Sequence, residues 1–167
     1  MRLWVRSIWL ALVLVSCQSD QSKTEYEYPD QLGSIAFNAA MDSSDFKLCN
    51  EADLVHSRTS LSYEGGKAKV VALAREWFAK SGSINFSGFV SVHFLVNCQG
   101  LPGRVRIEAM DGSFVEKEAP KALMDLLRNM VLSLDKWVIT KPANVGKDHS
   151  KYLIFKIVNG EIAGVTH

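Results

Sequence analysis

Two stretches of the chain carry apolar residues at helical spacing. Between Lys67 and Lys80 they recur every three or four residues, at Val70, Leu73, Ala74, Trp77 and Phe78. A second apolar stripe runs from Ala119 to Val131, and Pro120 suits the first turn of a helix. Both patterns predict an amphipathic helix with one apolar face.

Three other stretches alternate between apolar and polar residues, which is typical of strands. They cover residues 89–98, 104–109 and 152–158. The tight connection at 99–103 predicts that the first two strands pair as an antiparallel hairpin. Asn159-Gly160 is a turn signal, and we expect residues 162–165 to add a short edge strand.

The order of these elements is helix, strand, strand, helix, strand. It predicts an α+β fold, a small antiparallel sheet with two helices on one face. We expect this domain to occupy residues 46–167. Residues 17–45 are mostly polar or small, which predicts a flexible tether.

The first 16 residues have the organisation of a secretory signal peptide. Arg2 and Arg6 form a basic front, and an apolar run from Ile8 to Val15 precedes Ser16 and Cys17. This run is too short for a transmembrane helix, which needs about 20 apolar residues. Leu14-Val15-Ser16-Cys17 resembles the lipobox of bacterial lipoproteins. The resemblance implies removal of residues 1–16 and lipidation of Cys17.

The residue after the cysteine is Gln18 rather than aspartate. By the enterobacterial sorting rule, the lipoprotein resemblance then implies delivery to the outer membrane. The protein would be lipid-anchored there, either on the periplasmic face or at the cell surface. The membrane is thus an expected partner, through the lipid on Cys17.

Composition narrows the range of partners and chemistry. The chain has 19 basic and 18 acidic residues and no basic block, which argues against nucleic acid as a partner. Cys49 and Cys98 form an even pair in an oxidising compartment, which favours a disulfide, with two buried thiols as the alternative. Neither cysteine has a second ligand at metal spacing, so we expect no metal and no cofactor.

The histidines do not indicate an active site. His93 lies on a predicted strand, His56 lies in a polar loop without a ligand-spaced neighbour, and His167 is the last residue. Asp148, His149 and Ser150 supply the residue types of a hydrolase triad, but three consecutive residues cannot converge on one atom. With no recognised catalytic motif in the chain, we expect a protein that is not an enzyme.

The carboxy-terminal half contains a recognisable series of motifs. Gly88-Phe89-Val90-Ser91-Val92-His93-Phe94-Leu95-Val96-Asn97 is followed by Gly100, Val105 and Ile107. The second predicted helix comes next, and Trp137, Pro142, Gly146 and the strand 152–156 close the series. In order and spacing, residues 66–160 resemble the carboxy-terminal domain of TonB.

The chain also departs from TonB energy transducers. Those proteins keep an uncleaved inner-membrane helix with a functional histidine, followed by a long proline-rich spacer. Here the apolar segment has no histidine, and the whole chain has only four prolines. The family's Tyr-Pro segment between the first helix and the first strand is also absent, since residues 78–86 contain neither tyrosine nor proline. We therefore expect a TonB-domain-like lipoprotein that is not itself an energy transducer.

In the TonB family this domain binds a short extended segment of outer-membrane transporters by strand addition. The resemblance implies that the last strand is the binding edge, with Lys151, Tyr152, Ile154, Lys156 and Val158 as the partner-binding residues. An outer-membrane transporter or another envelope protein would be the partner. Residues after Asn159 could instead fold back and cover that edge.

Two alternative functions stay open at this point. One is a structural accessory lipoprotein of an outer-membrane transport or assembly complex. The more remote one is a hydrolase whose site the sequence does not reveal.

Overall fold

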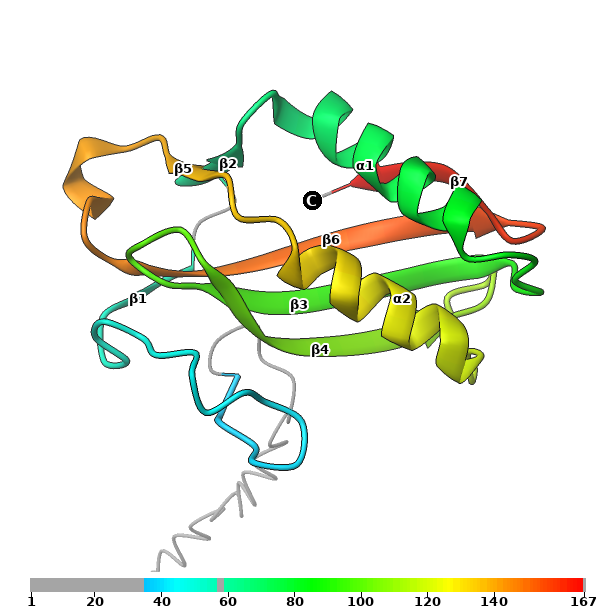
Figure 1. Ribbon diagram of the computed structural model, residues 1–167, viewed down its shortest axis with the longest axis horizontal. Helices are drawn as coiled ribbons and strands as arrows, with labels where there is room; N and C mark the ends of the chain where they lie inside the picture. The colour runs from blue at the N-terminus through cyan, green and yellow to red at the C-terminus, as the bar shows by residue number, and fades with distance from the viewer. Residues whose placement is uncertain (1–34, 57–58, 167) are drawn as a thin grey trace, which may run out of the picture.

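A computed structural model describes residues 35–56 and 59–166 and shows an α+β fold with a mixed sheet (Figure 1). The predicted signal peptide, Cys17 and the tether up to residue 34 lie outside the described residues. The principal elements are β3 (Gly88–Val96), β4 (Pro102–Met110), β6 (Asp148–Val158), α1 (Gly66–Lys80) and α2 (Lys121–Leu132). No helix within the described ranges has the length and apolar character needed to cross a membrane.

The remaining elements are short. They are β1 (Leu54–Val55), β2 (Leu61–Tyr63), β5 (Trp137–Ile139), the 3-10 helix η1 (Pro142–Asn144) and β7 (Glu161–Thr166). The main sheet has the order β1-β6-β3-β4, and β7 also pairs with β6. Strands β2 and β5 form a separate two-stranded sheet.

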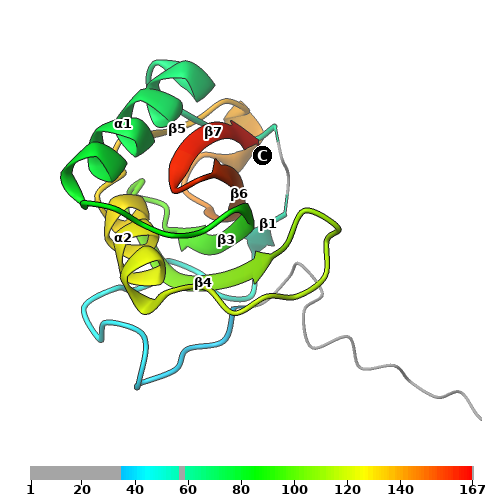
Figure 2. The ribbon, with the colours of Figure 1, turned by 90° about the vertical axis from the view of Figure 1, so that its right-hand side faces the viewer.

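The hydrophobic core lies between the sheet and the two helices. Strands β3 and β6 are antiparallel, with Val90 opposite Phe155 and Val92 opposite Leu153, and all four side chains are buried. Leu127 of α2 belongs to the same core cluster. The view along the strands in Figure 2 shows both helices on this side of the sheet. The alternation of apolar residues thus selects the face that the helices cover.

The sheet is not purely antiparallel, and here the sequence prediction was wrong. Strand β1 pairs with the start of β6 in parallel, with Leu54 opposite Asp148 and Val55 opposite His149. A two-residue strand is too short to show an alternating pattern, so periodicity could not reveal it.

The last long strand is not a free edge, which corrects a second prediction. After a tight turn at Asn159 and Gly160, strand β7 folds back and pairs with β6 from Ile154 to Val158. Both turn residues have positive φ, 51° and 80°, as the hairpin turns favoured between twisted strands require. A Cβ at position 160 would lie 1.9 Å from the carbonyl oxygen of Ile84, so only glycine fits there.

Part of the predicted tether packs against the domain. Arg106 donates to both carboxylate oxygens of Asp42 at 2.7 Å, and the Asp42 side chain is only 1% exposed. The guanidinium of Arg106 holds the pKa of Asp42 below its ordinary value. The part of the predicted tether that the structure describes therefore contacts β4 through Arg104 and Arg106.

Candidate functional site

The five residues predicted to bind a partner do not form one surface. Lys151 points into the core, where its Nζ donates to the carbonyl oxygen of Leu61 at 3.3 Å. Tyr152 lies on the opposite face and stacks on His93 at 5.7 Å between ring centroids. Val158 is exposed beside the turn into β7. Only Ile154 and Lys156 reach the groove described next.

A groove of about 370 Å³ follows the outer side of β7. Its lining comes from three places: residues 163–166 of β7, the outer face of the sheet, and one side of α1. The side chains beyond β7 are Lys67, Val71, Arg75, Phe89, Ile154 and Lys156. In Figure 2, β7 lies between β6 and α1, so the groove brings together segments that are distant in the sequence.

The outer backbone edge of β7 has no strand partner within the described part of the chain. Strand β7 pairs only with β6. The N–H and C=O groups on the other side of such a strand can pair with a further extended segment. Helix α1 packs on β7 but cannot continue its ladder, because the backbone groups of a helix are bonded within the helix.

The opposite edge of the sheet, along β4, is less open. The guanidinium of Arg128 donates to the carbonyl oxygen of Val105 at 3.1 Å. Further along the strand, Met110 pairs with Glu116, and Lys117 N–H donates to the carbonyl oxygen of Ala109. These contacts occupy groups that an added strand would need. Backbone groups are thus engaged along β4, whereas the outer edge of β7 has no strand partner among the described residues.

Two small residues shape the floor of the groove. Gly164 leaves open space where a Cβ would stand, and its φ lies outside the left-handed region. Ala163 is an extra residue in the β6–β7 pairing, because Lys156 faces Gly164 whereas Ile157 faces Ile162. Such a bulge interrupts a strand edge. An added segment would thus pair along 164–166, beside the groove.

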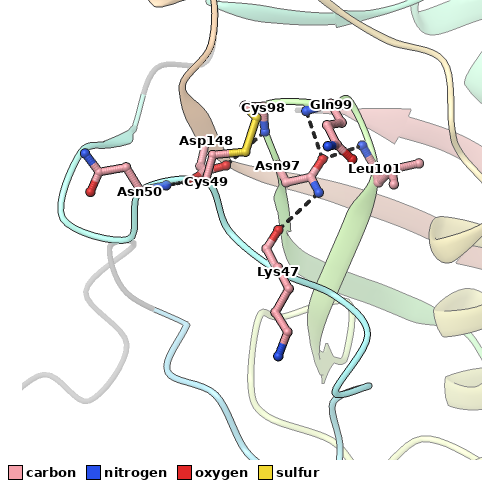
Figure 3. Close-up of a disulfide and its surroundings, with 8 residues drawn as sticks. All are labelled: Lys47, Cys49, Asn50, Asn97, Cys98, Gln99, Leu101 and Asp148. Carbon is pink, nitrogen blue, oxygen red and sulfur yellow. Dashed lines mark hydrogen bonds between the residues drawn. A yellow bond between two sulfur atoms is a disulfide. The ribbon is translucent and has the colours of Figure 1, made fainter.

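A second cluster surrounds the disulfide at the other end of the sheet (Figure 3). Cys49 and Cys98 are bonded with a Cα–Cα distance of 6.0 Å, which confirms the predicted disulfide. The Asp148 carboxylate is buried beside them and accepts the backbone N–H groups of Asn50 at 2.7 Å and Cys98 at 2.9 Å. Asn97 donates to the carbonyl oxygen of Lys47 at 3.1 Å.

This cluster contains the residue types of a metal site, but its sulfur atoms are not free to bind a metal. The two sulfur atoms and a carboxylate oxygen lie within 4.8 Å of one another. A metal requires thiolates, whereas these sulfur atoms are bonded to each other. Both carboxylate oxygens already accept hydrogen bonds. The cluster instead fastens the segment before β1 to the ends of β3 and β6.

The three consecutive residues of triad type do not converge. Asp148 binds backbone groups beside the disulfide, whereas His149 Nδ1 lies 3.2 Å from the hydroxyl of Ser60. Burial lowers the pKa of His149. The side chains of Ser60 and His149 are 0% and 1% exposed, so neither contacts dissolved substrate in this conformation.

Comparison with known proteins adds no relative, since no family model, curated protein or solved structure matches the chain. Sequence reasoning missed Lys67 and Arg75 as site residues. The two lie eight positions apart on the solvent side of a predicted helix, a pattern common to many surface helices. Only the return of β7 towards α1 brings them beside an open strand edge.

Proposed function

We propose that this protein is an outer-membrane lipoprotein, anchored through Cys17, whose domain binds an extended segment of another envelope protein. Binding would occur by strand addition at β7 rather than at β6. The resemblance to the TonB carboxy-terminal domain supports this class of function. The domain would act by binding, without catalysis and without transducing energy itself.

The free outer edge of β7 carries the proposal. A peptide laid along 164–166 would gain backbone hydrogen bonds, and the groove beside it would receive its side chains. Because Ile154 and Lys156 also line this groove, part of the predicted binding surface is retained. The partner would thus bind to β7 instead of β6, again by strand addition.

Site-specific photocrosslinking of the full chain in its own cells tests the proposal. A photoreactive amino acid replaces exposed Ala163 in the groove or, as a control, exposed Val145 in the loop before β6. We expect a partner adduct only from position 163. Mass spectrometry should locate it in an extended segment of that partner.

A matched pair of glycine variants tests whether the groove is needed. Gly164→Val fills the groove, whereas Gly112→Val adds the same side chain to a loop glycine that also has open space. We expect Gly164→Val to abolish the adduct and Gly112→Val to preserve it. An adduct that survives Gly164→Val would refute strand addition and favour a structural accessory role through another surface.

A further inference from the structure

The charges around the β7 groove indicate what kind of segment it binds. Resting on the proposed function, we infer that the groove recognises a partner segment in which carboxylate side chains alternate with apolar ones. The lining contains three cationic side chains, from Lys67, Arg75 and Lys156, and no acidic one.

These three cations are not engaged in ion pairs with described residues. The ion pairs of the described chain join Lys80 to Glu76, Arg104 to Glu51, Arg106 to Asp42, Lys121 to Asp125 and Lys147 to Asp53. Glu161 borders the neighbouring hollow at the end of α1, which it shares with Arg75, but forms no ion pair there. Among the described residues, no carboxylate forms an ion pair with the three cations of the groove.

This positive charge is local rather than general. The whole chain has 19 basic and 18 acidic residues, so an excess of three cations in one groove is a property of that site. A complementary anionic ligand would be favoured over a cationic one by attraction to Lys67, Arg75 and Lys156, and salt would weaken the preference.

The remaining walls of the groove are apolar. Val71, Phe89 and Ile154 line it, and the Phe89 ring is stacked on exposed Phe114 with 4.8 Å between centroids. An extended strand presents successive side chains to opposite sides. Lys67 and Arg75 lie on α1, whereas Phe89 and Ile154 lie on the outer face of the sheet beside Lys156. A segment whose carboxylates face α1 and whose apolar side chains face the sheet can therefore contact both.

Binding of labelled peptides to the lipidated full chain in detergent tests the inference. The probes are nine-residue capped peptides that alternate valine with glutamate, lysine or serine, followed by fluorescence anisotropy. We expect the glutamate peptide to bind about tenfold more tightly than the lysine peptide, since each exposed ion pair contributes up to a few-fold in affinity. Raising the salt concentration should reduce this difference.

Charge-neutralising variants of α1 provide the matched control. Arg75→Gln removes a cation from the groove, whereas Lys69→Gln removes one from an exposed position of the same helix outside it. We expect Arg75→Gln to weaken binding of the glutamate peptide about three-fold and Lys69→Gln to leave it unchanged. Circular dichroism melting should show that both variants are folded.

The outcomes separate the two proposals. Equal binding of all three peptides, lost in Gly164→Val, would overturn the acidic preference and leave strand addition standing. Absence of binding by every peptide would overturn the inference, and the crosslinking experiment would then decide on strand addition. A wild-type dimer that Gly164→Val converts to a monomer would assign the groove to a second copy of this chain and also overturn the inference.

Discussion

Removal of the Cys49–Cys98 disulfide should lower the free energy of unfolding by about 4 kcal/mol. The bond closes a loop with a sequence separation of 49 residues, and the loss of loop entropy in the unfolded chain gives this magnitude. The loop contains β1, β2, α1 and β3, so the unfolded chain is restricted over a large part of the domain.

The double variant Cys49→Ser/Cys98→Ser isolates this contribution, and urea unfolding followed by tryptophan fluorescence measures it. Wild type in a reducing agent should have the same stability as the double variant. A loss below about 1 kcal/mol, with an unchanged denaturant slope, would refute the argument. It would mean that the segment before β1 detaches before the core unfolds, so that the bond does not restrict the state measured.

The other predictions concern acid stability, the β6–β7 turn and lipidation. Burial lowers the pKa of His149, so below a pH of about 6.5 the unfolded state binds a proton that the folded state does not yet bind. The urea concentration at the midpoint of unfolding should therefore decrease as the pH falls from about 6.5 towards the folded-state pKa of His149. The variant His149→Gln should show a smaller decrease. Gly160→Ala places a Cβ 1.9 Å from the carbonyl oxygen of Ile84 at a φ of 80°, which should weaken the turn between β6 and β7. Amide hydrogen exchange should therefore accelerate in β7 more than in β3. An equal change of exchange rate in both strands would contradict this reasoning. Mass spectrometry of the mature protein should find an acylated Cys17 at the amino terminus, whereas an intact Met1 would exclude the processing.

The regular elements of the fold were predictable from periodicity. The predicted helix at 67–80 corresponds to α1 (Gly66–Lys80), and the alternation at 89–98 corresponds to β3 (Gly88–Val96). These segments are long enough for one apolar face to repeat several times. The Asn159-Gly160 dipeptide also predicted its turn, because few residues tolerate positive φ at both positions.

The sequence was less informative where pairing depends on distant segments. Nothing in Leu54–Val55 specifies a parallel partner, and Asp42 shows no periodic relation to Arg106. The site was missed for the same reason. Two of its three cations lie on α1 and the third on β6, its open edge lies on β7 and its apolar wall partly on β3, so that no local pattern contains them all.

In the proposed mode of binding, the six residues of β7 determine which edge of this domain would accept a partner. Without them, β6 would expose its backbone groups from Ile154 to Val158, as the resemblance to TonB implies. With them, those groups are paired, and the open edge moves next to α1, where Lys67 and Arg75 lie. The open edge at β7 also differs from a β6 edge in its side chains, because α1 contributes residues that β6 alone does not offer. If the proposed function holds, this short hairpin at the end of the sheet would preserve strand addition as a mode of binding while changing the ligand that the edge selects.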